Sequence, residues 1–357
     1  MSGRAERLAE RLDAAGVDLL LVTNLVNVRY LTGYTGSNGL TLVGRETRRF
    51  ATDFRYVEQV ADEVDPSFER AELESDLLGA LAALLPGGPL RLGFEPRDLT
   101  VAGHKRLQEA LPPGVELVAA DGLVEAMREV KDSEEVARIR DAAALADAAL
   151  AELLEGRLVG RTERDVALEL EVAMRRRGAE RPSFDSIVAA GEHGALPHAT
   201  PRETEIRRGD LVVLDWGAQL DGYCSDCTRT IAAGEPDGGA AEAYELVLEA
   251  QLAGLLAVRA GAGGREVDAV ARRVIEAGGR GEQFGHGLGH GVGLEVHEAP
   301  RLSKTYDCKL AAGNVVTVEP GVYVPGEFGV RIEDLVVVGE DGPDILTEIP
   351  KELTVAG

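Results

Sequence analysis

Cysteine is scarce in this chain of 357 residues, which contains only three. An odd and small number of cysteines argues against a disulfide framework. Long apolar runs are also missing, because no stretch approaches the roughly 18 residues that a membrane-spanning helix needs. The first fifteen residues carry charges of both signs and lack the apolar centre of a signal peptide. We therefore expect a cytoplasmic protein that does not bind membranes.

Positive charge is in deficit, with 38 basic against 62 acidic residues and a net charge of −24. Nucleic-acid binding depends on Lys and Arg side chains that neutralise phosphates, so this balance argues against a nucleic-acid partner. Apolar residues make up 45% of the chain, which is enough for packed cores and too many for a disordered chain. The length of the chain favours two domains.

The two parts of the chain differ in their pattern of predicted helices and strands. Residues 1–129 alternate helix-like and strand-like segments, as α/β domains do. Asp132 and Glu135 have the spacing of a capping box, which predicts the start of a long helix and places the domain boundary just before it. Residues 130–357 mix helices and strands without strict alternation, which favours an α+β domain. Its apolar strands are expected at 211–218, 223–231, 315–319 and 331–338.

Two of these expected strands each contain a carboxylate that a buried strand should not have, Asp215 and Asp226. Asp221 and Gly222 between them form a strong signal for a two-residue hairpin turn. Such a turn pairs Asp215 with Thr228 and places Asp226 two residues away on the same face. Two like charges so close are costly unless a cation or raised pKa values relieve them.

Three histidines, His286, His290 and His297, fall within the fourteen residues from Gly285 to Glu298. The glycines between them exclude a helix and allow close approach of the backbone. Neither a dinucleotide-binding nor a phosphate-binding glycine motif is present in this segment. Three histidines at this spacing are typical of a metal or acid/base cluster.

Two further carboxylates follow. Glu319 ends one predicted strand, and Glu333 lies inside another. Arg331 lies two residues before Glu333 and shares a face with it if the strand is continuous. Two Asp, two Glu and at least one His suit divalent ions such as Mn²⁺, Co²⁺ or Zn²⁺. Carboxylates can also bridge two such ions, as in two-metal hydrolases.

With these residues the sequence resembles the pita-bread metallopeptidases. Nearly the whole chain is similar to their Xaa-Pro peptidase branch, which comprises prolidase and aminopeptidase P. The resemblance implies a homodimer in which a smaller creatinase-type α/β domain precedes a pita-bread α+β catalytic domain. In the catalytic half it rests on LDWGA, DCTRT, GHGVGLEVHE, VEPGVY and VRIED, and before it on NVRYLTGYTGSNG and TDFRYVEQ.

The resemblance also implies two divalent metal ions, with Mn²⁺ favoured and Co²⁺ or Zn²⁺ as alternatives. Asp215 would bind one ion, and His290 and Glu319 the other. Asp226 and Glu333 would bridge the two. A metal-bridging hydroxide would attack the scissile carbonyl, with Glu319 as general base.

The remaining roles concern the substrate, which is expected to be a small peptide with proline at its second position. His198 and His297 would stabilise the tetrahedral intermediate, and His286 would line the pocket. Arg331 would orient a bridging ligand or a substrate group. In a dipeptidase, either Arg301 or Arg331 would hold the substrate's carboxylate.

Several alternatives stay open from the sequence. An Xaa-Pro dipeptidase and an Xaa-Pro aminopeptidase share these residues. A methionyl-aminopeptidase-like or broader aminopeptidase shares the five ligands, although the long amino-terminal domain argues against it. A creatinase-like hydrolase or a non-catalytic peptide-binding module on the same fold would lack the metal set.

Other conspicuous residues receive plainer interpretations. Cys224 and Cys227 lie three apart on a strand and should face opposite ways, which argues against redox or zinc chemistry. His193 is expected in a solvated loop. His104 is expected at the surface, and Trp216 in the core because it follows Asp215 on the strand.

Overall fold

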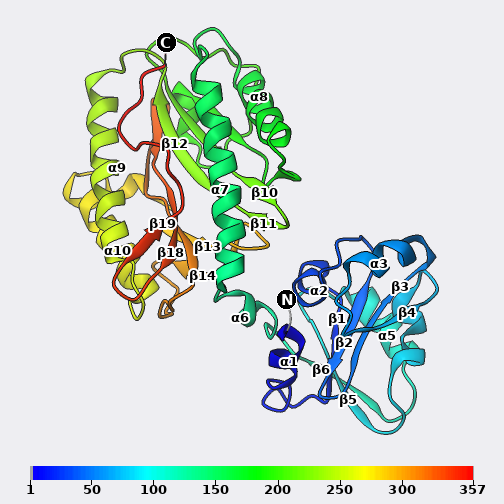
Figure 1. The fold of residues 1–357 in the computed structure, drawn as a ribbon. Coiled ribbons are helices and arrows are strands. Elements are labelled where there is room, and N and C mark those ends of the chain that lie inside the picture. The colour runs from blue at the N-terminus through cyan, green and yellow to red at the C-terminus, as the bar shows by residue number, and fades with distance from the viewer. Residues whose placement is uncertain (1–2, 357) are drawn as a thin grey trace. The chain divides into compact units, whose positions relative to one another are not determined.

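The chain divides between Arg128 and Glu129 into two units, shown in Figure 1. The structure is a computed structural model that describes residues 3–356, so residues 1, 2 and 357 of the expected domains lie outside it. Within residues 3–356, every helix is too short or too polar to cross a lipid bilayer.

The amino-terminal unit is built on one six-stranded sheet in the order β4-β3-β2-β1-β5-β6. β2 pairs antiparallel with both β1 and β3, and β5 and β6 run parallel to β1. Parallel strands need helical crossovers, which explains the alternation in the sequence. The strands are β1 (Leu19–Val22), β2 (Leu40–Gly44), β3 (Arg48–Thr52), β4 (Glu69–Glu72), β5 (Leu90–Phe94) and β6 (Val115–Ala119).

Short helices connect these strands, and one of them begins at an Asn cap. The Asn24 side chain accepts hydrogen bonds from the backbone N–H groups of Val26 and Asn27, and the helix ends at Gly33 with a φ of 88°. Glycine adopts that left-handed conformation at little cost. The helices are α1 (Arg4–Ala9), α2 (Leu25–Thr32), α3 (Val57–Glu63), α4 (Leu77–Ala80), α5 (Val101–Ala110) and α6 (Glu125–Arg128), with 3₁₀ turns η1 (Phe54–Tyr56) and η2 (Leu81–Leu84).

The second unit contains two helix pairs on either side of antiparallel strands (Figure 1). The first pair starts with α7, whose capping box between Asp132 and Glu135 is confirmed. Each pair packs on its own apolar cluster. The helices are α7 (Ser133–Leu154), α8 (Glu163–Arg176), α9 (Gly238–Ala257) and α10 (Gly264–Ala277), with 3₁₀ turns η3 (Gly191–Ala195) and η4 (Gly281–Gln283).

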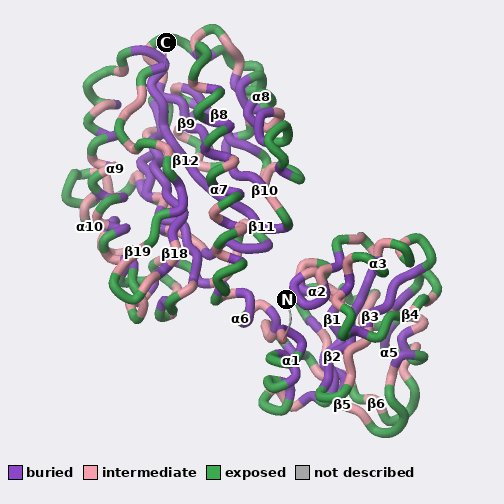
Figure 2. The backbone as a smooth tube through the Cα atoms, viewed as in Figure 1, coloured by how far each residue is buried: buried purple, intermediate pink, exposed green. Residues whose placement is uncertain are grey.

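The strands between the helix pairs are short and mostly antiparallel. Figure 2 shows that β9, β12 and β18 are buried, whereas the helices expose their outer faces. The α+β prediction for this unit is confirmed. The strands are β7 (Arg181–Pro182), β8 (Ile187–Ala190), β9 (Leu211–Trp216), β10 (Ala218–Leu220), β11 (Tyr223–Cys224), β12 (Cys227–Ala232), β13 (Gly289–Gly291), β14 (Glu298–Leu302), β15 (Val315–Val318), β16 (Gly321–Val324), β17 (Phe328–Arg331), β18 (Asp334–Val338) and β19 (Pro343–Ile345).

Three predicted strands are interrupted in the structure: 211–218 at Gly217, 223–231 at Ser225 and Asp226, and 331–338 at Ile332 and Glu333. β17 ends at Arg331 and pairs with β16, whereas β18 begins at Asp334 and pairs with β15. Glu333 lies in the two-residue connection between them. A change of partner between two sheets cannot be read from an apolar run, because periodicity reports burial and not the neighbouring strand.

Candidate metal centre

The hairpin that carries the two aspartates has the predicted register. β9 and β12 pair Asp215 with Thr228, and the turn positions Asp221 and Gly222 have φ values of 48° and 85°. Both are left-handed, as a two-residue turn of this type requires. Asp226 lies just before β12.

These two aspartates meet Glu333 in one buried cluster. One carboxylate oxygen from each of Asp215, Asp226 and Glu333 lies within 4.8 Å of the others. Burial and the carboxylates of Glu333 and Asp215 raise the pKa of Asp226 well above its usual range. Burial, with Glu319 and Asp215 nearby, raises the pKa of Glu333 in the same direction. The cluster therefore holds protons where exposed carboxyls would not.

His290 faces this cluster from β13. Its Nε2 lies 3.3 Å from Oε1 of Glu319 and 3.6 Å from Oδ2 of Asp226. Its Nδ1–H donates to the Gly291 carbonyl at 3.1 Å, which leaves the Nε2 lone pair directed at the carboxylates. Burial and His297 lower the pKa of His290 to about 3, so its imidazole is neutral at pH 7.

The glycines on either side of His290 allow neighbouring strands to approach. A Cβ at Gly289 would overlap the Thr317 carbonyl oxygen, and one at Gly291 would overlap that of Ala299. The close approach of the backbone that these glycines predict is therefore an approach of β13 to the adjacent strands β15 and β14. Side chains here would push His290 away from the carboxylates.

Arg331 connects several parts of the site. Its Nη2 donates to Oδ2 of Asp215 at 2.6 Å, and its Nε to Oγ1 of Thr228 at 3.0 Å. Thr228 donates in turn to Oε2 of Glu333 at 2.6 Å. The Nη1 of Arg331 donates to the Tyr323 hydroxyl at 2.9 Å and to the Pro197 carbonyl at 3.1 Å. All three nitrogens of this guanidinium are thus engaged by protein oxygens.

The sequence prediction did not include Tyr323, although it lies in the quoted phrase VEPGVY. Its hydroxyl donates to Nε2 of His286 at 2.9 Å. Burial lowers the pKa of His286 to about 4, which keeps this imidazole neutral. Tyr323 therefore joins His286 to Arg331. Because Tyr323 lies on a separate strand, β16, the positions of His286 and Arg331 in the sequence could not indicate this contact.

A cavity of about 650 Å³ opens above the cluster. Asp226 and Glu333 are buried at its floor, whereas His198, His297 and Arg301 are exposed side chains in its wall. Among the described residues, no hydrogen bond or ion pair joins the Arg301 guanidinium to another side chain. All ten predicted site residues line this one cavity: His198, Asp215, Asp226, His286, His290, His297, Arg301, Glu319, Arg331 and Glu333.

The prediction for His193 is wrong. The residue is buried, 5% exposed, and its Nδ1–H donates to Oε2 of Glu163 at 2.8 Å. Glu163 also accepts from the backbone N–H groups of Ala190 at 2.8 Å and Arg202 at 3.0 Å. One buried carboxylate therefore holds both ends of residues 190–202, the segment that contains His198.

The remaining minor predictions have mixed outcomes. Trp216 is fully buried and its indole N–H donates to the Ala146 carbonyl, as a core residue should. Cys224 and Cys227 are free and buried, and no disulfide joins them. His104 is half-buried against the ring of Phe94, so it is less exposed than expected.

With this geometry in place, comparison with known families decides the relationship. Residues 137–340 match the model of metallopeptidase family M24, and residues 4–130 match the creatinase/prolidase N-terminal domain. The chain belongs to metallopeptidase family M24. The predicted family and its fold class, a pita-bread domain after a creatinase-type domain, are confirmed.

Individual relatives extend over the whole chain. A solved Xaa-Pro dipeptidase from Bacillus anthracis is 43% identical, covers 99% of both chains and has a TM-score of 0.95. A solved X-Pro aminopeptidase from Thermotoga maritima is 38% identical, also with 99% coverage of both chains, and has a TM-score of 0.90. An Xaa-Pro dipeptidase from Pyrococcus horikoshii is 35% identical over 358 residues, 99% of each sequence.

Family M24 implies divalent metal ions, and the residues at the cavity fit them. Oδ1 of Asp215 and Oε1 of Glu333 are buried side-chain oxygens that find no hydrogen-bond partner within residues 3–356. Buried oxygens without a partner are costly, and a cation would satisfy both. The donors are carboxylates and one neutral imidazole, which suits a hard or borderline divalent ion.

Metal binding to this cluster is expected to strengthen as the pH rises from 6 to 8. Burial raises the pKa of Glu319 to about 7 from an ordinary value near 4.5. A metal ion must displace such protons, so its dissociation constant should fall by about tenfold per pH unit for each proton displaced. Calorimetric titration of Mn²⁺ at several pH values measures this slope.

Glu319 should contribute to the unfolding free energy of the metal-free protein in the opposite direction. Between pH 4.5 and 7 the folded Glu319 still holds a proton that the unfolded chain has released, so this carboxyl lowers stability as the pH rises. The neutral His286 and His290 act in the other direction over the same window, so the test compares two proteins. Urea unfolding at several pH values should show that metal-free Glu319→Gln loses less stability, or gains more, from pH 4.5 to 7 than the unmodified protein; the same pH dependence in both would contradict the raised pKa of Glu319.

Proposed function

We propose that this chain hydrolyses the peptide bond before proline in small peptides, at a centre of two divalent metal ions. The observation that carries the proposal is the convergence of four carboxylates and one neutral imidazole on the floor of a single cavity. The similarity to Xaa-Pro dipeptidases and to an X-Pro aminopeptidase supports the substrate class.

In this proposal, Asp215 would hold one ion, His290 and Glu319 would hold the other, and Asp226 and Glu333 would contribute to both. Mn²⁺ is the first ion to test, before Co²⁺ and Zn²⁺. Bound ions would supply a hydroxide at neutral pH and polarise the scissile carbonyl. The protein's own part is to hold these donors in place, as Arg331 does for Asp215 and, through Thr228, for Glu333.

Proton transfer is assigned to Glu319. As a carboxylate that lines the cavity, Glu319 can accept a proton from the attacking water and return it to the proline nitrogen. That nitrogen has no N–H of its own before cleavage, so the leaving group requires a proton. His198 and His297 in the cavity wall can donate hydrogen bonds to the oxygen that becomes negative in the transition state.

Glu163 should affect this reaction through His198. In Glu163→Gln, the amide cannot accept from all three N–H groups that the carboxylate now binds. We expect faster hydrogen exchange in residues 190–202 and a kcat that is about tenfold to a hundredfold lower. The affinity for Mn²⁺ should not change, because none of the predicted metal ligands lies in this segment.

Glu169→Gln provides the control, because Glu169 lies on the same helix in an exposed pair with Arg161. A Glu163→Gln enzyme with normal exchange and normal kcat would show that the segment does not depend on this carboxylate. A double variant with His198→Ala adds a second check. If Glu163 acts through His198, the two losses should not add.

The choice between dipeptidase and aminopeptidase depends on what meets the substrate's carboxyl end. Arg331 already donates from each of its three guanidinium nitrogens to protein oxygens, whereas the Arg301 guanidinium is in the cavity wall without a protein partner among the described residues. We propose that Arg301 binds the carboxylate of an Xaa-Pro dipeptide by a charge-assisted pair.

Arg301→Met should therefore raise KM for Ala-Pro by about tenfold to a hundredfold, the value of one charged hydrogen-bonded pair. KM for Ala-Pro-Ala should change less. Arg273→Met, an exposed arginine on α10, is the control. Exclusive cleavage of the tripeptide by the unmodified enzyme would instead favour the aminopeptidase, which the similarity to the Thermotoga maritima enzyme keeps as the second candidate.

A further inference from the structure

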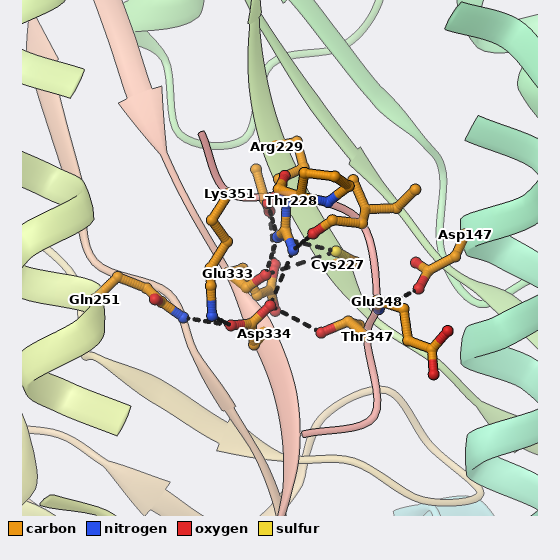
Figure 3. Close-up of polar contacts among 12 residues, drawn as sticks. Asp147, Cys227, Thr228, Arg229, Gln251, Glu333, Asp334, Thr347, Glu348 and Lys351 are labelled. Carbon is orange, nitrogen blue, oxygen red and sulfur yellow. Dashed lines mark hydrogen bonds and ion pairs between the residues drawn. The ribbon is translucent and has the colours of Figure 1, made fainter. Parts of the chain in front are cut away.

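A second buried polar cluster lies behind Glu333, outside the residues that line the cavity (Figure 3). Its centre is an ion pair between Nη2 of Arg229 and Oδ1 of Asp334 at 2.9 Å, and both side chains are 1% exposed. Asp334 directly follows Glu333 in the chain. The chemistry proposed above does not use this pair, and a buried ion pair is by itself weak support for stability.

Arg229 contacts the backbone of Glu333 directly. Its Nη1 donates to the Glu333 carbonyl oxygen, and the Glu333 N–H donates to the Thr228 carbonyl at 3.1 Å. Glu333 lies between β17 and β18 and belongs to neither strand. Its backbone is therefore held by β12, through Thr228 and Arg229, and not by a strand ladder of its own.

The C-terminal segment, Thr347–Lys351, completes the cluster. Lys351 Nζ lies 2.6 Å from Oδ2 of Asp334, and the Thr347 hydroxyl donates to Oδ1 at 2.9 Å. The carbonyl oxygens of Ile349 and Pro350 accept from Arg229 at 2.6 Å and 3.0 Å. Gln251 on α9 supplies the remaining contact to Asp334. Figure 3 shows Gln251 from α9 and Lys351 and Thr347 from the C-terminal segment directed at Asp334.

We propose that the C-terminal segment, acting through Arg229 and Asp334, positions Glu333 for metal binding. The proposal rests on the ligand role proposed for Glu333. A metal ligand must be held to within about 0.5 Å of its working position. Loss of the groups that support a ligand typically weakens metal binding by about tenfold to a hundredfold. The residues of the segment are thus positioning residues, about fifteen positions beyond the ligand in sequence.

Lys351→Met tests this proposal because electrostatics and positioning predict opposite changes in the affinity for metal. Removing a positive charge near a cation site should strengthen metal binding if only long-range electrostatics mattered. Loss of positioning should weaken it instead. We expect calorimetry on metal-free protein to show a dissociation constant for Mn²⁺ that is about tenfold higher or more in Lys351→Met.

Three further variants complete the design. Thr347→Val removes a different contact to Asp334 and should weaken Mn²⁺ binding in the same direction. Lys351→Arg keeps the charge and a donor, and should restore most of the affinity. Lys309→Met, at an exposed lysine of the same unit, should leave the affinity unchanged. Thermal unfolding of each metal-free variant confirms that it is folded.

Unchanged or tighter Mn²⁺ binding in both folded variants, Lys351→Met and Thr347→Val, would overturn the inference. Glu333→Gln separates it from the ligand assignment: if that variant binds Mn²⁺ normally, the ligand role and the inference both fail. If the unmodified protein binds Mn²⁺ but cleaves no Xaa-Pro peptide, only the proposed function fails. The calorimetric comparison then still decides the positioning role.

Discussion

Asp226→Asn is expected to lower kcat/KM for an Xaa-Pro dipeptide by about a thousandfold or more. That loss corresponds to about 4 kcal/mol of transition-state stabilisation. Asp226 lies between the other carboxylates, and its own carboxylate oxygen is 3.6 Å from Nε2 of His290. An amide at this position carries no charge and cannot bridge two ions, so both metal binding and hydrolysis should be lost. His290→Ala should have the same effect.

Steady-state kinetics and metal analysis of the purified variants check this prediction together. Asp344→Asn is the matched control, because Asp344 forms an exposed pair with Arg140 and exposed pairs contribute little. Near-normal hydrolysis by a folded Asp226→Asn variant that retains no metal would contradict the mechanism. Hydrolysis that is lost while both metal ions remain bound would contradict the bridging role.

Arg331→Met is expected to lower the unfolding free energy of the metal-free protein by about 3–5 kcal/mol. The guanidinium is buried, 3% exposed, and it donates to Asp215, Thr228 and Tyr323. A methionine fills similar space but removes a hydrogen-bond donor from each of these groups and from the Pro197 carbonyl. The cost therefore comes from the orphaned groups more than from the lost attraction.

Urea unfolding of metal-free protein measures this loss, and Arg273→Met is the control. A destabilisation below about 1 kcal/mol, the value typical of an exposed pair, would show that Arg331 does not hold the site together. The variant should also bind Mn²⁺ more weakly, because Asp215 is no longer oriented. We expect added Mn²⁺ to recover only part of the lost stability.

The hairpin could be predicted from the sequence because its geometry is local. Once Asp221 and Gly222 form a two-residue turn, counting along the chain fixes Asp215 opposite Thr228. The capping box at Asp132 is equally local. The helix α2 has similar signals, an Asn cap and a terminal glycine, and these could have been read.

The errors concern contacts between residues far apart in sequence. His193 is buried because Glu163, thirty positions earlier, binds it and both ends of its segment. The interruption before Glu333 arises because successive strands pair with different sheets. Neither fact leaves a pattern in the local sequence. The ten candidate residues nevertheless line one cavity. The carboxylates could be found because they stand out from the apolar residues around them, whereas His198 was indicated by the family resemblance.

The central claim is that this chain cleaves Xaa-Pro bonds with two divalent ions, and one titration tests it most directly. Enzyme freed of metal by chelation is titrated with Mn²⁺ while hydrolysis of Ala-Pro and Ala-Pro-Ala is followed. We predict no cleavage without metal and a return of activity that saturates near two ions per chain. Full activity in the metal-free protein, or no cleavage of either peptide at saturating Mn²⁺, Co²⁺ and Zn²⁺, would contradict the account.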